Sequence, residues 1–337
     1  MSPGSVWLQF ALCVGLIGIA GSRLSRYGDV IAEKTGLSGT WIGLILLATV
    51  TSLPELVTGL SSVVLADTPN IALGDVLGSC VFNLFIIMIL DFLHRGESVY
   101  TRAGQGHILS AGFGIVLIGF VGFNVLLAGH GASFSIGHVG AYTPIIMVLY
   151  GIAMFTVFRY ERRQMAAFTE EVAERYHDVT LRQAVLRYAV AALVVVGAGT
   201  WLPFVGDQMA EVMGWHKTFV GTLFVAFATS VPEIVVTVAA LRIGALDMAI
   251  GNLFGSNLFD IAIVAVDDLL FFKGPILSYV SPLHAVSVVS AIMMTGIAVI
   301  GLLYRPKTRV FQTVGWASLF LLSLYLLNSY VLYLYGE

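Results

Sequence analysis

The chain has 337 residues, of which 58% are hydrophobic and only 11% are charged. A soluble globular protein uses roughly 25% charged residues to cover its surface, and a disordered chain needs low hydrophobicity, so the composition excludes both classes. The formal net charge of −3 argues against a nucleic-acid partner, and Cys13 and Cys80, each within an apolar run, exclude a disulfide framework. An all-α integral membrane protein in a lipid bilayer remains.

Ten apolar stretches are long enough to cross a membrane. A hydrocarbon core about 30 Å thick requires about 20 apolar residues per helix. No basic segment precedes the first stretch, and Arg23 and Arg26 follow it, so it is expected to be a span and not a signal peptide. The predicted spans are residues 5–22, 39–66, 70–93, 107–129, 138–158, 183–204, 218–242, 246–270, 281–303 and 310–335.

The distribution of Lys and Arg predicts the orientation, because the inner loops of membrane proteins are rich in these residues. If the N-terminus lies outside, 15 of the 17 Lys and Arg residues fall in inner loops, and only Lys217 and Lys273 lie outside. We therefore expect a multi-pass protein of the cell (inner) membrane with both termini extracytoplasmic. The charged segment 159–182 is expected to be a cytoplasmic linker between two five-helix halves, residues 1–158 and 183–337.

The two halves repeat each other in sequence. Residues 51–57, Thr-Ser-Leu-Pro-Glu-Leu-Val, match residues 229–235, Thr-Ser-Val-Pro-Glu-Ile-Val, at an offset of 178. Residues 74–83 match residues 251–260 at an offset of 177. The second span runs from inside to outside and the seventh from outside to inside, so the repeat is inverted. This pattern is typical of alternating-access transporters, which bind their substrate near the membrane midplane.

Each repeat carries one glutamate inside an apolar span, Glu55 in the second span and Glu233 in the seventh. A carboxylate at that depth is unfavourable unless it meets water, a cation or a partner. No Lys or Arg lies in the interior of either span. The alternatives are a protonated glutamate bonded within the helix bundle and a cation site, and the equal position in both repeats favours the cation site.

A proline precedes each glutamate. Pro54 and Pro232 lack a backbone donor and kink the helix, which is expected to free the carbonyl groups around residues 48–50 and 226–228. A membrane tolerates free carbonyls only where they line a cavity or meet a ligand. A purely structural kink is the alternative.

Hydroxyl and amide side chains accompany the carboxylates. Thr51 and Ser52 lie four and three residues before Glu55 and share its helix face, and the second repeat has the same spacing. The set comprises Thr51, Ser52, Ser79, Asn83, Thr229, Ser230, Ser256 and Asp260. These groups offer only oxygens, which hard cations prefer. Calcium accepts about six to eight oxygens, and sodium would accept the same hydroxyls and carbonyls with fewer carboxylates, so competition for one cluster would give exchange.

The paired Thr-Ser-x-Pro-Glu and Gly-Asn/Asp-x-x-Gly-Ser-x-x-x-Asn/Asp motifs resemble the two alpha repeats of the cation/calcium antiporter superfamily, and most closely its prokaryotic sodium/calcium exchanger branch. The resemblance implies ten helices, with a compact core of spans 2, 3, 7 and 8 and long, tilted spans 1 and 6 that slide across it. It also implies that Glu55 and Glu233 share the calcium ion, and that Asn83 and Asp260 complete the site. The sodium sites that it implies are Thr51, Ser52, Ser79 and the Ala48 carbonyl on one side, and Thr229, Ser230, Ser256 and the Ala226 carbonyl on the other.

Four positions depart from the family pattern. Val50 and Ala228 replace the usual glycine before Thr-Ser, and Asp75 and Cys80 replace usual asparagines. Three of the four lie in the first repeat, where they are expected to narrow or retune the sodium site. Asp260 also resembles the potassium-dependent branch, whereas proton-coupled members usually carry Gly-Asn-x-x-Glu, which is absent here.

The leading hypothesis is a secondary antiporter that exports Ca²⁺ in exchange for Na⁺, with these ions as its ligands, no cofactor and no obligate protein partner. A proton- or potassium-linked exchanger, or one for another divalent cation, is the alternative within transport. A cation channel would use similar oxygens but has no need of inverted repeats. The sequence has no His-Glu-x-x-His, Gly-x-Ser-x-Gly or Gly-x-Gly-Asp motif of an intramembrane hydrolase, so we expect no enzyme.

Further acidic residues lie near span ends. Asp91, Asp267 and Asp268 are expected at interfaces, with an ion entry funnel as the alternative. His107 and His284 also lie near span ends and are assigned no metal.

Overall fold

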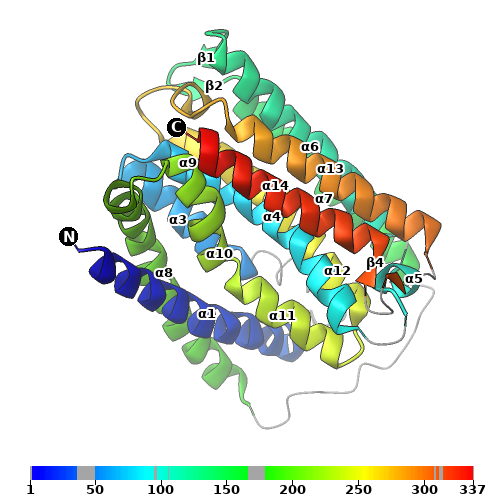
Figure 1. Ribbon diagram of the computed structural model, residues 1–337. Coiled ribbons are helices and arrows are strands. Elements are labelled where there is room, and N and C mark those ends of the chain that lie inside the picture. Colours follow the sequence, from blue (N-terminus) through cyan, green and yellow to red (C-terminus); the bar gives the residue numbers. More distant parts are fainter. Residues whose placement is uncertain are drawn as a thin grey trace.

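The computed structural model describes residues 2–35, 50–94, 97–104, 106–165, 179–306, 309–310 and 314–336, and nearly all of them are helical (Figure 1). The elements are α1 (Pro3–Lys34), α3 (Leu53–Val64), α4 (Pro69–Leu93), α5 (Val99–Arg102), α6 (His107–Gly129), β1 (Ser135–Ile136), β2 (Val139–Gly140), α7 (Tyr142–Met165), α8 (Leu181–Met213), α9 (Lys217–Val220), the π-helical turn η1 (Gly221–Val225), α10 (Ala226–Thr229), α11 (Val231–Arg242), α12 (Leu246–Leu270), the 3-10 turn η2 (Ile276–Ser278), α13 (His284–Tyr304), β3 (Arg309–Val310), β4 (Val314–Gly315) and α14 (Trp316–Tyr335). The strands form two short antiparallel hairpins, β1 with β2 and β3 with β4.

Eight helices of the described residues are long and apolar enough to cross a membrane, namely α1, α4, α6, α7, α8, α12, α13 and α14. The seventh predicted span is present as a broken one, because residues 217–229 and 231–242 meet at an angle of 46°. The second predicted span is described only from Val50 onward, as the end of its first part and the short apolar helix α3. The predicted end of the first span at residue 22 is wrong, since α1 continues to Lys34.

The helices fall into a central bundle and a peripheral pair. The chain's largest hydrophobic cluster joins α4 and α12 to α6, α7, α13 and α14. The helices α1 and α8, with 32 and 33 residues, pack against each other on the side of the molecule opposite this bundle and form the peripheral pair (Figure 1). A second cluster links this pair to η1. The long first and sixth spans that the resemblance implies are therefore present, whereas the largest hydrophobic cluster of the described residues includes α6, α7, α13 and α14 beside spans 3 and 8.

Local sequence explains how α8 and the broken span begin and end. Thr180 and Gln183 form a capping box at the start of α8, and Gly214 ends the helix in the left-handed conformation. Pro54 and Pro232 stand in the first turn of α3 and α11, where a missing backbone N–H costs no helix bond. The prolines therefore divide each motif span into two helical pieces.

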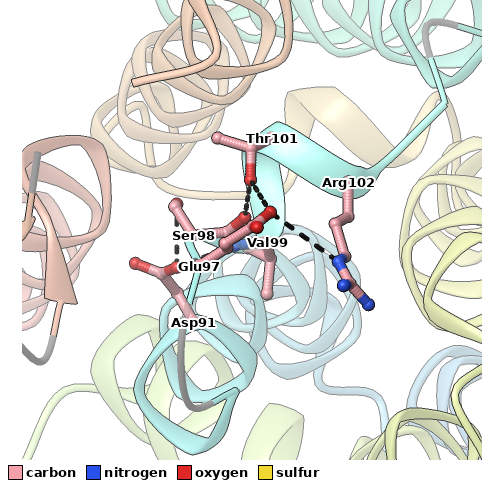
Figure 2. Close-up of polar contacts among 6 residues, drawn as sticks. All are labelled: Asp91, Glu97, Ser98, Val99, Thr101 and Arg102. Atoms are coloured by element: carbon pink, nitrogen blue, oxygen red, sulfur yellow. Dashed lines mark hydrogen bonds and ion pairs between the residues drawn. The ribbon is translucent and has the colours of Figure 1, made fainter. Parts of the chain in front are cut away.

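A buried aspartate closes one end of the bundle. Asp91, in the last turn of α4, accepts hydrogen bonds from the Ser98 hydroxyl (2.9 Å) and the Val99 backbone N–H (3.0 Å), as Figure 2 shows. Its second oxygen accepts from the Gly315 N–H (2.7 Å) and the Ser318 hydroxyl (2.8 Å) at the start of α14. Asp91 thus ties a helix of the first half to the last helix of the second half.

The same arrangement recurs at the end of α12. Asp268 lies 177 positions after Asp91 and accepts from the Ile276 N–H (2.7 Å) and the Tyr142 hydroxyl (2.6 Å). The Gly140 N–H (2.8 Å) and the Thr143 hydroxyl donate to its other oxygen. Asp268 therefore ties the second half to α7 of the first half. The expected interface position of both aspartates at the ends of their spans stays a prediction.

A second repeat-related pair of contacts lies at the starts of α4 and α12. Asn70 accepts from the Ser281 N–H (2.7 Å) and lies 3.2 Å from the His284 ring nitrogen Nε2. Asp247, 177 positions later, accepts from the Gly104 N–H and lies 3.0 Å from Nε2 of His107. These histidines therefore hold helix starts, which is consistent with assigning them no metal.

The α4 helix also meets the broken span at glycines. A Cβ on Gly74 would lie 3.0 Å from the backbone of Gly221, and one on Gly78 would lie 2.4 Å from the Thr222 carbonyl oxygen. Such distances leave no room for a side chain, so the two backbones are in direct contact. This contact sets the distance between the motif helices of the two halves.

We expect Asp268→Asn to lower the free energy of unfolding by about 2 kcal/mol or more. An amide has only one oxygen, so its NH2 group would face donors that now meet a carboxylate oxygen. Thermal unfolding of the purified protein in detergent measures the effect. Asp67→Asn, which removes an exposed ion pair with Lys273, is the control and should cost less than about 1 kcal/mol. Equal melting temperatures for the two variants would contradict the structural role of Asp268.

Gly78→Ala is expected to destabilise the protein by about 1–3 kcal/mol, because the new Cβ forces α4 away from η1. Gly197→Ala is the matched control, since a Cβ at that α8 position meets nothing within 4 Å. The same unfolding measurement compares the two. A Gly78→Ala variant as stable as Gly197→Ala would show that the backbone contact is not as close as described.

Candidate cation-binding site

The first group of polar side chains surrounds Glu55 and is named the Glu55 lobe. The oxygen Oε1 of Glu55 accepts hydrogen bonds from Ser230 (3.2 Å) and Ser79 (3.5 Å), and Ser230 also lies 3.0 Å from the Ser79 hydroxyl. Beside them, the Thr229 hydroxyl donates to Oδ1 of Asp75 at 2.8 Å. All five residues are buried, and they come from α3 and α4 of the first half and the α10–α11 bend of the second.

The second group surrounds Glu233 and is named the Glu233 lobe. Ser52 donates to Oε1 of Glu233 at 3.4 Å. The Thr51 hydroxyl lies 3.4 Å from the Ser256 hydroxyl and 3.5 Å from Oδ1 of Asn252. Every member is the repeat-related counterpart of a member of the Glu55 lobe, with Asn252 in place of Asp75. The two lobes are therefore related by the repeat and differ by one charge.

A third group of side chains joins α4 to α12. Asn83 donates to Oδ1 of Asn257 at 3.0 Å, and Asn257 donates to the Cys80 carbonyl at 3.2 Å. The Cys80 thiol lies 3.9 Å from Oδ2 of Asp260. Cys80 thus fills the position of the usual asparagine with a weak donor and adds no oxygen ligand.

Several buried acceptor oxygens in these groups have no hydrogen-bond donor. They are Oε2 of Glu55, Oε2 of Glu233, Oδ2 of Asp75, Oδ1 of Asp260 and Oδ1 of Asn83. In the described part of the chain the ion pairs lie elsewhere, at Glu97, Asp247, Asp207 and Asp67. Buried acceptors normally have a partner, so bare carboxylate oxygens with no basic residue beside them are suited to a cation.

The oxygens are spread over two lobes and are not gathered at one point. Among the described residues, no group of three or more His, Cys, Asp or Glu side chains converges as a metal site. A cation here must therefore be held by hydroxyl and amide oxygens as well as by carboxylates, which is a donor set for hard cations.

The hydrogen bonds differ from the grouping that the family resemblance implies. Ser79 lies with Ser230 and not with Thr51, and Ser256 lies with Thr51 and not with Thr229. The reason is that each motif of one half packs against the glycine-rich helix of the other half. The roles of these residues as ligands stay predictions.

The two predicted carbonyl ligands fare differently. Ala48 lies outside the described residues. The Ala226 carbonyl accepts the Ser230 N–H at 3.0 Å and lies 3.1 Å from the Thr229 hydroxyl. The expectation that Pro232 frees this carbonyl is wrong, because Pro232 withdraws its donor from Ala228, four residues back, and not from Ala226.

Three residues of these groups have no predicted ligand role. Asp75 is predicted only to depart from the family pattern, and Asn252 and Asn257 enter only as parts of the motif. The constant offset of the repeat pairs Asp75 with Asn252 and Cys80 with Asn257. These pairs are the sequence signal that the lobes carry unequal charge.

The peripheral pair crosses the site at glycines. In α1, a Cβ on Gly21 would lie 2.3 Å from the Pro232 ring. In α8, a Cβ on Gly199 would lie 3.0 Å from the Val57 side chain, and Thr58 donates to the Gly199 carbonyl at 3.4 Å. Gly21 and Gly199 are repeat-related at the offset of 178, which also pairs Ala20, Leu24, Gly28 and Asp29 with Ala198, Leu202, Gly206 and Asp207. The sequence repeat therefore includes the first and sixth spans.

The two halves differ in register at these crossings. The counterpart of Pro232 is Pro54, yet Gly199 lies against Val57, three residues further on. A second crossing agrees. A Cβ on Gly28 would lie 3.8 Å from the side chain of Val50, whose counterpart is Ala228, whereas a Cβ on Gly206 would lie 3.1 Å from the side chain of Val225. Three residues of helix correspond to about 4–5 Å. A joint shift changes the registers of α1 and α8 in opposite senses, so the pair lies half that distance, about 2 Å, from a repeat-symmetric position.

Comparison with known proteins places these features in a family. A family profile described as "Sodium/calcium exchanger protein" matches residues 5–160 and 184–335. The inner membrane protein YrbG of Escherichia coli (strain K12) is 27% identical over 256 residues, which cover 75% of this chain and 76% of that protein. The sodium/calcium exchanger MaX1 of Methanosarcina acetivorans is 27% identical over 279 residues, which cover 73% of this chain and 77% of that protein.

A solved structure has the same fold. The crystal structure of the H⁺/Ca²⁺ exchanger CAX matches with a TM-score of 0.69 at 13% sequence identity, over 98% of this chain and 82% of that chain. At this identity the likeness concerns the fold alone.

Proposed function

Because the chain belongs to the sodium/calcium exchanger protein family, we propose that it exports Ca²⁺ across the membrane in exchange for Na⁺. The family match confirms the resemblance of the motifs and makes the protein a membrane exchanger of cations. Sodium as the coupling ion is supported by the name of the relative MaX1 and by hydroxyl groups in both lobes. The ions are the cargo, and no cofactor or obligate protein partner is proposed.

The proposal rests on two buried carboxylate oxygens that have no hydrogen-bond donor, one on each motif glutamate. Glu55 and Glu233 each keep Oε2 without a donor while Oε1 accepts serine hydroxyls. A Ca²⁺ ion shared by the two glutamates, with Asn83 and Asp260 as further ligands, would satisfy these oxygens. Several Na⁺ ions distributed over the hydroxyls of Thr51, Ser52, Ser79, Thr229, Ser230 and Ser256 and the carbonyls of Ala48 and Ala226 would do so equally. The Ca²⁺ ion and the Na⁺ ions cannot be bound at the same time, so binding of one kind of ion releases the other.

The register difference of α1 and α8 supports alternating access. If the pair slides by about 4–5 Å, Gly21 reaches Val235 while Gly199 reaches Pro54, and the two halves exchange their roles. A cation-free site would leave carboxylates without compensation under the moving pair, which opposes the slide. The pair therefore slides only when cations occupy the site, so ions are exchanged and neither ion crosses the membrane alone.

The proposed topology has ten spans in two inverted five-helix repeats, residues 1–158 and 183–337, joined by the linker 159–182. The contacts of Asp91 and Asp268, which recur at equal offsets in both halves, support the repeat. Both termini are proposed to be extracytoplasmic and the linker cytoplasmic, on the distribution of Lys and Arg.

A proton-linked or potassium-linked exchanger of divalent cations is the second candidate, favoured by the fold shared with the H⁺/Ca²⁺ exchanger CAX. Uptake of radioactive calcium into proteoliposomes distinguishes the candidates. Vesicles loaded with Na⁺ and diluted into sodium-free buffer should take up Ca²⁺, whereas vesicles with only a pH or potassium gradient should not. Uptake driven by a pH or potassium gradient alone would show that H⁺ or K⁺, and not Na⁺, is the coupling ion. Uptake without any ion on the opposite side of the membrane would indicate a channel.

Glu55→Gln and Glu233→Gln are each expected to lower sodium-driven calcium uptake at least 100-fold, because each removes a charge that faces the ion. Glu97→Gln is the control, since Glu97 is exposed and pairs only weakly with Arg102. Uptake is measured in the proteoliposomes described above. Calcium transport at wild-type rates in either glutamine variant would rule out the site.

Cysteine pairs test the slide. Val57→Cys with Gly199→Cys should cross-link in the present state, since the Cβ positions are 3.2 Å apart, and oxidation should stop exchange reversibly. Gly21→Cys with Val235→Cys should cross-link only when the pair has slid. Failure of this second pair to cross-link in a protein that transports calcium would contradict the slide.

A further inference from the structure

The two repeat-related lobes differ at one buried position. In the Glu55 lobe this position is Asp75, and in the Glu233 lobe it is Asn252. Both side chains face a motif threonine, because Thr229 donates to Asp75 and Thr51 to Asn252. Both are almost fully buried, with exposures of 0% and 2%. The lobes therefore hold repeat-related side chains of unequal charge.

The free atom of each side chain has the opposite chemistry. Oδ2 of Asp75 has no hydrogen-bond partner, and the free atom of Asn252 is its amide nitrogen Nδ2. A carboxylate oxygen attracts a cation, whereas an amide NH2 group offers only donors and repels one. The Glu55 lobe thus holds two carboxylates with bare oxygens, Glu55 and Asp75, and the Glu233 lobe holds one.

A structural role for Asp75 accounts for only one of its oxygens. The bond from Thr229 to Oδ1 would be kept by asparagine, as the equivalent bond from Thr51 to Asn252 demonstrates. A carboxylate in place of the amide adds a buried charge, which is unfavourable unless a cation compensates it. Asp267 on α12, another buried carboxylate with a bare oxygen, brings no positive charge to this end of the core.

On the premise of the proposed function, we infer that Asp75 is a cation ligand that gives the Glu55 lobe a site for one positive charge which the Glu233 lobe lacks. The ligands of this site are Oδ2 of Asp75, Oε2 of Glu55 and the hydroxyls of Thr229 and Ser230. They are all oxygens, so the site takes a hard cation, and Na⁺ is the monovalent ion that the proposed exchange supplies. The sodium-loaded protein consequently holds one more Na⁺ ion, whose charge the Asp75 carboxylate offsets, than an otherwise equal protein with asparagine at residue 75.

Equilibrium binding of radioactive sodium to the purified full-length protein in calcium-free detergent solution tests the inference. Asp75→Asn should bind one Na⁺ ion fewer, or raise the half-saturating concentration at least tenfold. Asn252→Asp, the repeat-related control, should change binding in the opposite direction. Because that variant adds a charge and keeps Asp75, it tests the same principle even if Asp75→Asn does not fold.

The outcomes separate this inference from the proposed function. Sodium binding by Asp75→Asn equal to that of the wild type would overturn the inference, as would a wild type that binds no sodium. A wild type that binds sodium through Asp75 but exchanges no calcium for it would support the inference and contradict the proposed function. In proteoliposomes that do exchange, Asp75→Asn should move one sodium ion fewer for each calcium ion.

Discussion

A buried carboxylate must be compensated, and the architecture depends on two different solutions to that requirement. Asp91 and Asp268 are compensated permanently by backbone N–H groups and hydroxyls at the ends of α4 and α12. Glu55 and Glu233 keep one oxygen bare in the middle of the core. The first pair fixes the frame, and in the proposed function the second pair is left for an ion. Under that proposal, similar side chains serve rigidity at the ends and exchange at the centre.

The division of the helices follows from the same requirement. A frame that is tied at both ends and packed backbone to backbone at Gly74 and Gly78 keeps the lobes at fixed spacing. The pair α1 and α8 meets that frame mainly through glycines and apolar side chains, which offer few directional bonds to break. The proposed slide is therefore confined to the surface that covers the proposed cation site.

Much of this organisation could be predicted from the sequence, because depth in a membrane makes polar residues conspicuous. The repeated Thr-Ser-x-Pro-Glu motif identified Glu55 and Glu233, and the spans α4, α6, α12 and α13 were predicted from their apolar length. The cross-half grouping of Ser79 with Ser230 could not be predicted, since it depends on which faces pack together. The prediction of a free Ala226 carbonyl is wrong because a proline removes the donor for the carbonyl of the residue four positions back. The predicted end of the first span is wrong because a helix can continue beyond its apolar stretch.

The ties at Asp91 and Asp268 impose an order on biosynthesis. The donors Gly140, Tyr142 and Thr143 precede Asp268 in the chain, so all but the nearby Ile276 already exist when α12 is made. Asp91 is made early, yet its donors Gly315 and Ser318 follow 224 and 227 residues later in the chain. Until then the end of α4 holds only the neighbouring donors Ser98 and Val99. Asp91 therefore gains its second pair of donors only when α14 has been made. A chain that stops before α14 leaves the end of α4 incompletely anchored.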